Sequence, residues 1–274
     1  MSRYIRAIYA PLVGVRVSNQ ELLDAIALRF KALEIDDAVA EAHASLVWVK
    51  STYDWDWVGA ETEYKRTIEL NPNYVAVLTY YSGPLLAMRR LDEALAITKR
   101  REQIDPLLLI NSTIVGRTLY LRRQYDQAIE QLQRVIETDA NFAQAHLYLG
   151  LAYEQKGMFE ESIAEFQKGS SLSGGDPRMA AALGNACAVS GKTARAQSVI
   201  AELKQQSSQR YVAPVEIAII YVGLGEKEQA FEWLEKAYRD HSPWLIWLNA
   251  DPRFDRLHSD PRFADLLRRI GLPQ

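Results

Sequence analysis

The chain has 274 residues, 48% of them hydrophobic, so it contains enough apolar side chains to fill a core. Its 32 basic and 35 acidic residues give a formal net charge of -3, which excludes a large sequence-independent attraction to nucleic-acid phosphates. The single cysteine, Cys187, excludes an internal disulfide framework, and no stretch of about 18 uncharged apolar residues predicts a membrane span. We therefore expect a cytoplasmic protein with neither membrane nor nucleic acid as its partner.

The first 39 residues predict an incomplete unit. Residues 1–17 begin with arginines and an apolar run, but Pro11 and Arg16 interrupt that run, so no signal peptide is predicted. Ser18 and Glu21 then form a capping-box pattern at the start of an expected helix, about residues 19–34. Its apolar stripe needs a partner surface and includes Ile26, Phe30 and Leu33.

A period of 34 residues organises the rest of the chain. When the stretch 143–176 is shifted by 34 residues in either direction, small residues align with small ones and apolar residues with apolar ones. The period predicts two helices per repeat. The repeats are 40–74, which is one residue longer, 75–108, 109–142, 143–176, 177–210 and 211–244. Such a unit cannot bury its apolar face alone, so successive repeats must stack.

Two columns of small residues predict where the helices of each repeat approach closely. The eighth position of the repeats holds Val47, Ser82, Gly116, Gly150, Gly184 and Ala218. The twentieth position holds Ala60, Ala94, Ala128, Ser162, Ala196 and Ala230. The seventh position is mostly large, with Leu46, Tyr81, Val115, Leu149, Leu183 and Ile217. Large against small side chains at fixed spacing is how paired helices reach native packing density.

At these positions the chain resembles the tetratricopeptide repeat (TPR) family. Matches include Tyr153, Gly157, Phe159, Phe166 and the Asn-Pro or Asp-Pro repeat ends, and the resemblance covers about residues 19–244. It implies an all-α fold: a right-handed superhelical solenoid of helix-turn-helix repeats over residues 1–244, with a short C-terminal helical cap over 245–274. The ending resembles the tails of TPR regions that in bacteria follow winged-helix, nucleotide-cyclase or protein-kinase domains, which implies a regulatory role in signalling.

The tail has a physical task of its own, because the last repeat exposes an apolar face that needs a cap. In Asp251-Pro252 and Asp260-Pro261 the aspartate can cap a short helix whose first residue is proline. We expect these helices to pack on the helix that contains Phe231, Trp233 and Leu234.

The resemblance also implies a binding surface, because in the family the first helix of each repeat lines a concave groove. The residues at the groove positions are Trp48, Thr79, Tyr80, Arg117, Tyr120, Leu147, Tyr148, Leu151, Asn185, Val215 and Ile219. Their aromatic rings are suited to anchoring an apolar or amphipathic segment of a protein or peptide. An equally good reading is that several of them pack between adjacent repeats.

No catalytic residue, metal site or cofactor is predicted. The histidines lack metal-ligand spacing, and SGKT at 190–193 lacks the earlier glycine and the strand that a phosphate-binding loop needs. Basic clusters occur at 89–90, 99–101 and 122–123. We interpret them as a solvated edge interleaved with acidic residues rather than a stripe for an acidic partner or RNA.

The leading hypothesis is a non-catalytic scaffold for protein–protein interaction. The alternatives are an RNA-binding helical repeat that uses Arg117 and the tyrosines for stacking, and an enzyme with an unrecognised site. A further alternative is homodimerisation through the apolar face of the incomplete N-terminal repeat.

Overall fold

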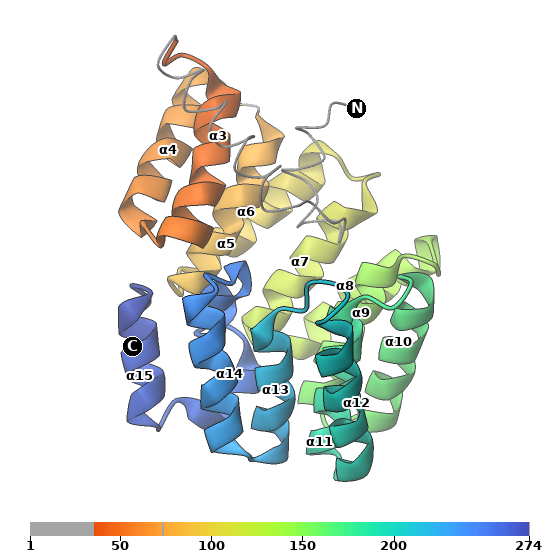
Figure 1. Cartoon of the computed structure of the whole chain (residues 1–274). Coiled ribbons are helices and arrows are strands. Elements are labelled where there is room, and N and C mark those ends of the chain that lie inside the picture. Colours follow the sequence, from red (N-terminus) through yellow and green to blue (C-terminus); the bar gives the residue numbers. More distant parts are fainter. Residues whose placement is uncertain (1–35, 73, 274) are drawn as a thin grey trace. The chain divides into compact units, whose positions relative to one another are not determined.

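The computed structural model describes residues 36–72 and 74–273 of the chain, and these residues form helices and turns without a strand. The expected capping box at Ser18 and the helix over 19–34, with its apolar stripe, lie outside the described residues. The chain divides into an N-terminal unit, Met1–Pro84, and a C-terminal unit, Leu85–Gln274. Each unit is described by itself (Figure 1).

The N-terminal unit contains one complete helix pair and most of the helix that follows it. Its elements are α3 (Ala40–Val49), the π-helical turn η1 (Lys50–Asp54), α4 (Trp57–Leu70) and α5 (Val75–Ala87), which runs across the division between the units. The extra residue of repeat 40–74 is accommodated where α3 ends in the π turn, because a π turn inserts one residue into a helix.

The C-terminal unit contains four complete helix pairs and a helical tail, which Figure 1 labels from α6 to α15. The first helices are α7 (Leu109–Leu121), α9 (Ala143–Gln155), α11 (Pro177–Val189) and α13 (Pro214–Leu224). The second helices are α6 (Leu91–Ile104), α8 (Tyr125–Thr138), α10 (Phe159–Leu172), α12 (Thr193–Gln206) and α14 (Lys227–Arg239). The tail contains η2 (Pro243–Trp247), η3 (Pro252–Leu257) and α15 (Pro261–Arg269).

The 34-residue period predicted from the sequence is confirmed. The second helices begin 34 residues apart, at Trp57, Leu91, Tyr125, Phe159, Thr193 and Lys227. The first helices keep the same spacing from Val75 to Pro177. In the repeat 211–244, however, helix α13 begins only at Pro214, whose ring suits the first helical position and whose missing N–H would be unpaired there anyway.

The small-residue columns lie where each pair of helices packs closely. Every residue of the twentieth-position column is fully buried. In the eighth-position column, a Cβ atom on Gly150 would lie 2.6 Å from the Phe166 ring, and one on Gly116 would lie 2.6 Å from Leu132. The large seventh-position residues are buried except Leu183, which is partly exposed. The repeats therefore use large-against-small packing, as the sequence predicts.

The turn between the two helices of each repeat has a left-handed residue at a fixed position. Its φ is positive in six successive repeats, at Trp55, Arg89, Arg123, Gly157, Gly191 and Gly225. Glycine adopts this conformation without a steric cost, whereas an arginine in it costs roughly 1–2 kcal/mol. The two arginines therefore need a compensating role.

Helix α15 covers α14, as the sequence predicts for a cap. The guanidinium of Arg262 lies 4.1 Å from the centre of the Phe231 ring and pairs with Glu228 at 2.8 Å. Arg269 lies over Tyr238 at 3.9 Å, and the inward face of α15 buries Phe263 and Leu266. Asp260 caps this helix by accepting a hydrogen bond from the backbone of Arg262.

Candidate interaction site

Seven of the predicted groove residues come together in the C-terminal unit. They line one pocket of about 110 Å³ and lie on three first helices. These residues are Arg117 and Tyr120 of α7, Leu147, Tyr148 and Leu151 of α9, and Val215 and Ile219 of α13. Contacts between neighbouring first helices, α7 with α9, α9 with α11 and α11 with α13, bring them to one face of the unit.

The other four predicted residues lie elsewhere. Asn185 of α11 lines a second cavity, described below. Trp48, Thr79 and Tyr80 belong to the N-terminal unit, where Thr79 and Tyr80 are buried. The ring of Trp48 is partly exposed and meets the Tyr53 ring edge-on, with 5.5 Å between their centres.

The C-terminal tail also contributes to the pocket, which the sequence analysis missed. Residues 243–257 place five side chains in its wall, which are Trp244 and Trp247 of η2, the η3 cap Asp251, and Arg253 and Phe254 of η3. The prediction that the tail helices pack on α14 was therefore incomplete, since α15 packs there but η3 contacts α13. The segment before α15 contacts α7 through Tyr120 and α13 through η3, so repeats and tail together line the pocket.

A buried polar cluster fixes the tail in this position. Asp251 caps η3 by accepting a hydrogen bond from the backbone of Arg253, and the guanidinium of Arg253 binds the same carboxylate at 2.6 Å. The hydroxyl of Tyr120, on α7, donates to Asp251 at 3.1 Å. Burial opposes ionisation of Asp251, but the charge and hydrogen bonds of Arg253 outweigh it and lower the pKa of that carboxyl.

Arg89 and Arg123, the two arginines with a positive φ, also bind the tail. Arg89 donates to the carbonyl of Asn249 at 3.0 Å, and Arg123 donates to the carbonyl of Ala250 at 2.9 Å. Arg123 also pairs with Asp255 at 2.8 Å. The interpretation of these two arginines as part of a solvated edge was therefore incomplete, since Arg89 is exposed and Arg123 partly exposed but both also bind the tail. Both donate hydrogen bonds to the tail backbone, and the sequence of the tail does not predict these contacts.

Two arginines lie over the tail tryptophans at the pocket. The guanidinium of Arg117 is 4.9 Å from the centre of the Trp247 ring, and that of Arg178 is 5.5 Å from the centre of the Trp244 ring. Asp176 caps α11, and its carboxylate also pairs with the guanidinium of Arg178 at 2.6 Å. Asp176-Pro177-Arg178 thus repeats the geometry of Asp251-Pro252-Arg253.

Two glutamates near these Asp-Pro-Arg segments hold their protons unusually tightly. Burial raises the pKa of Glu154 to about 7, and burial together with the charge of Asp176 raises the pKa of Glu216 to about 8. Glu154 accepts a hydrogen bond from the amide of Asn185 at 2.8 Å. One carboxyl oxygen of each glutamate is buried without a hydrogen-bond partner.

Glu154 and Asn185 lie in a second, more polar cavity of about 170 Å³. Arg253 lines both this cavity and the apolar pocket, so the tail forms a wall between them. The side-chain oxygen of Asn185 is also buried without a partner. Unpaired buried acceptors of this kind are satisfied by ordered water when a cavity is large enough.

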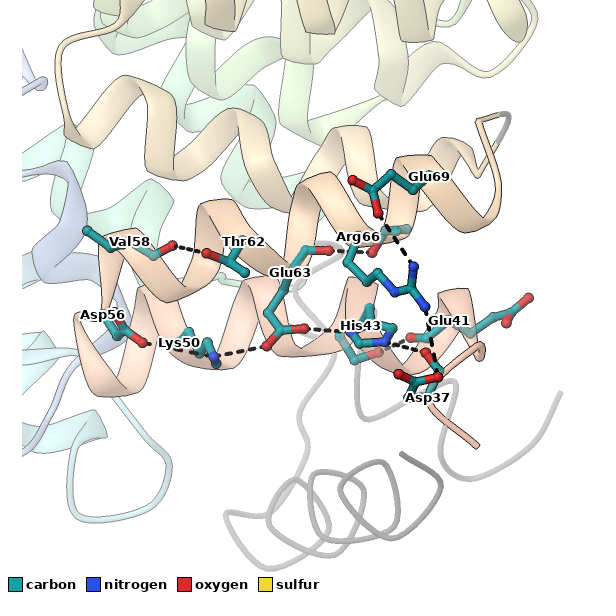
Figure 2. Close-up of polar contacts among 12 residues, drawn as sticks. Asp37, Glu41, His43, Lys50, Asp56, Val58, Thr62, Glu63, Arg66 and Glu69 are labelled. Atoms are coloured by element: carbon teal, nitrogen blue, oxygen red, sulfur yellow. Dashed lines mark hydrogen bonds and ion pairs between the residues drawn. The ribbon is translucent and has the colours of Figure 1, made fainter. Parts of the chain in front are cut away.

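The histidines of the repeats contribute to packing between helices. In the N-terminal unit, His43 of α3 is 2.6 Å from Glu63 of α4, which also pairs with Lys50 at 2.9 Å (Figure 2). In the C-terminal unit, His146 is 2.5 Å from Glu165, so the same pair recurs. Among residues 36–72 and 74–273, no cluster of three or more His, Cys, Asp or Glu side chains could hold a metal ion.

Comparisons with known proteins identify the repeats. Residues 116–157 match the TPR repeat family, and residues 143–175 and 215–239 match the tetratricopeptide repeat family. These segments are similar to tetratricopeptide repeats. TPR proteins are generally scaffolds for protein–protein interaction, and the TPR fold is generally non-catalytic. No curated protein sequence matches the chain.

Solved TPR structures share the helical solenoid fold. A tetratricopeptide repeat protein from Parabacteroides merdae is similar with a TM-score of 0.61 and 15% identity, over 98% of each chain. PilW, a type IV pilus biogenesis factor, has a TM-score of 0.55 and 18% identity over 78% of this chain and 94% of its own. Pseudomonas aeruginosa PilF has a TM-score of 0.54 and 18% identity over 82% of this chain and 95% of its own. At these identities the likeness concerns the fold alone.

Proposed function

We propose that the chain is a protein-interaction scaffold that binds an apolar or amphipathic segment of a partner protein at the pocket between its first helices and its tail. The observation that carries this proposal is the convergence of seven groove residues with two tail tryptophans around one cavity. Large aromatic side chains around an apolar pocket are typical of the centres of protein interfaces.

The apolar cavity is of the size that takes one side chain. Its volume of about 110 Å³ is somewhat below the roughly 150 Å³ of an engineered protein cavity that binds benzene. One anchoring side chain in a partly open pocket, with the flanking segment lying across the first helices, is a common mode of peptide recognition.

A pocket-filling substitution tests this proposal. Ala181 of α11 is buried in the pocket wall, so Ala181→Leu fills part of the cavity. Ala201→Leu makes the same change on the exposed face of α12 and is the matched control. Dodecamer peptides selected by display on the full chain are expected to bind the wild type and Ala201→Leu but to lose at least tenfold in affinity for Ala181→Leu. Equal binding to both variants contradicts the site.

We also propose that this scaffold is the regulatory part of a bacterial signalling protein in the cytoplasm. The support is the resemblance of the tail to those that follow winged-helix, cyclase or kinase domains, together with a single, buried cysteine that needs no oxidising compartment. No helix among residues 36–72 and 74–273 is long and apolar enough to span a membrane. Cell fractionation of the tagged chain tests the location, and recovery outside the cytoplasm contradicts it.

A further inference from the structure

The arginines of the pocket differ in how their charges are balanced. Arg178 and Arg253 each pair with the aspartate two residues earlier, Asp176 and Asp251, at 2.6 Å. Arg117 has no such partner within the part of the chain that the structure describes, and its buried Nε atom has no hydrogen-bond acceptor. One positive charge in the pocket wall is therefore uncompensated.

Arg117 is nevertheless positioned. Its guanidinium lies over the Trp247 ring, which belongs to the tail, while Arg117 itself belongs to α7. A guanidinium stacked on a ring keeps its N–H edge available for partners in its own plane, and that edge matches the geometry of a carboxylate. The stack thus presents a charged donor beside an apolar cavity.

The remaining ionisable group of the pocket does not cancel this charge at neutral pH. Glu216, partly buried on α13, holds its proton because burial and Asp176 raise its pKa to about 8. Its protonated carboxyl is neutral and can itself donate a hydrogen bond. The other walls are largely apolar and include Leu147, Leu151 and Ile219.

We propose that the pocket takes an apolar side chain of a partner segment in which a neighbouring residue is Asp or Glu, and that Arg117 binds this carboxylate. The proposal rests on the interaction function inferred above and specifies the chemistry of the partner. The apolar cavity selects the anchor, and the unpaired guanidinium selects the sign of the charge beside it. The tail takes part, because Trp247 positions the guanidinium.

Three small probes of the same shape test the charge preference. They are 3-phenylpropionate, the neutral 3-phenylpropan-1-ol and the cationic 3-phenylpropylamine. Each is titrated into the ¹⁵N-labelled full chain, and the indole N–H signals of Trp244 and Trp247 are followed after assignment with Trp→Phe variants. The acid is expected to bind about fivefold more tightly than the alcohol, as for one partly exposed ion pair, and the amine more weakly than either.

Variants of Arg117 show whether this residue causes the preference for the acidic probe. Arg117→Gln is expected to remove the advantage of the acid and leave alcohol binding unchanged, whereas Arg117→Lys retains part of the advantage. Arg134→Gln, at an exposed position of α8, is the matched control and should change nothing. If Arg117→Gln also abolishes alcohol binding, the residue shapes the pocket and does not select charge, which overturns the inference.

The pH dependence gives an independent readout. Glu216 is faced by Asp176 and Arg178 at the start of α11, by Arg210 and Tyr211 in the connection to α13, and by the backbone of Ala213. As pH rises through about 8, Glu216 ionises and repels an acidic ligand. Affinity for the acid should therefore fall in the wild type and stay level in Glu216→Gln. An equal fall in both contradicts this part of the inference.

The outcomes separate the charge preference from the interaction function itself. If acid and alcohol bind equally and both shift the Trp247 signal, the charge preference is wrong while the apolar site stands. If none of the probes shifts either indole signal, the partner chemistry proposed here is wrong. In that case the Ala181→Leu and Ala201→Leu comparison still decides whether peptides use the pocket.

Discussion

Arg89 and Arg123 occupy the same position of successive repeats and bind successive carbonyls of the tail, those of Asn249 and Ala250. Both have a positive φ, +59° and +61°, where the next three repeats have glycine. A local conformational cost at two turns is thus offset by contacts with a segment more than 120 residues away. Repeat and tail are thus in contact through a turn position that holds glycine in the later repeats.

This coupling predicts the sign of a substitution. Glycine at position 123 relieves the left-handed strain of roughly 1–2 kcal/mol, but it removes the hydrogen bond to Ala250 and the pair with Asp255. We expect Arg123→Gly to lower the free energy of unfolding by about 1 kcal/mol net, measured by urea denaturation. Asparagine also tolerates a positive φ without the extra chain entropy of glycine, so Arg123→Asn is the control and should be destabilised as well. A variant more stable than the wild type contradicts the tether.

Stability is expected to fall as pH rises from 5 to 8. Glu154 and Glu216 have pKa values raised from 4.5 to about 7 and about 8, so the folded chain holds protons that the unfolded chain releases. Their contribution is complete below about pH 4.5 and is lost as pH rises through the folded-state values. Asp251, whose pKa is lowered, acts in the opposite direction but below this range.

Glu154→Gln tests the part of this effect that comes from Glu154, the glutamate with the smaller of the two pKa shifts. Glu154 is 5% exposed, and a shift of this size corresponds to about 3 kcal/mol as an order of magnitude. We expect the variant to lose much of the decrease in unfolding free energy between pH 5 and 8, as followed by urea titrations at each pH. Glu160→Gln, which changes an exposed glutamate on α10, is the control and should keep the wild-type slope. If the decrease in unfolding free energy with pH is the same in Glu154→Gln as in the wild type, the Glu154 carboxyl does not cause it.

Because α9 and α10 approach closely at Gly150, a methyl group added there is expected to lower the free energy of unfolding. Gly150→Ala places a Cβ atom 2.6 Å from the Phe166 ring, which is fully buried. We expect a loss of about 1–3 kcal/mol in unfolding free energy. Phe166→Leu removes part of the ring, so the double variant should be less destabilised than the sum of the single ones. Strict additivity contradicts a direct contact between the two positions.

The tail cluster predicts coupling between Tyr120 and Asp251. Tyr120→Phe removes the hydroxyl that donates to the Asp251 carboxylate, and both residues are buried. We expect a cost of about 1–2 kcal/mol. In a double-mutant cycle with Asp251→Asn, a coupling energy of at least 0.5 kcal/mol is expected. If the two substitutions change the free energy of unfolding additively, the hydrogen bond does not link α7 to the tail.

The repeat pattern predicted the helices and their packing because period and side-chain size act locally. The spacing of Gly150 from Ser162 places both at the contact of one helix pair, without reference to the rest of the chain. Seven of the residues predicted for a groove line one pocket for the same reason, since their repeat position determines which face of the first helix they occupy. The family resemblance supplied which face that is.

The tail could not be placed in this way. Trp244 is the last residue of repeat 211–244 and Trp247 lies beyond it, so neither occupies a groove position that would assign it to the pocket. Arg89 and Arg123 stand in charged turns, where a solvated side chain is the usual outcome. The sequence feature that could have indicated these contacts is arginine at a turn position where the later repeats have glycine. Recognising it requires the backbone conformation of that turn as well as the residue types.

The contact between Trp247 and Arg117 joins the tail to α7 at the pocket. In a nuclear Overhauser spectrum of the full chain, the account predicts cross-peaks between the Trp247 ring protons and the Arg117 side chain, whose guanidinium carbon lies 4.9 Å from the ring centre. Trp247→Phe assigns the ring signals. Cross-peaks from Trp247 to other tail residues alone, with none to α7, would contradict the account.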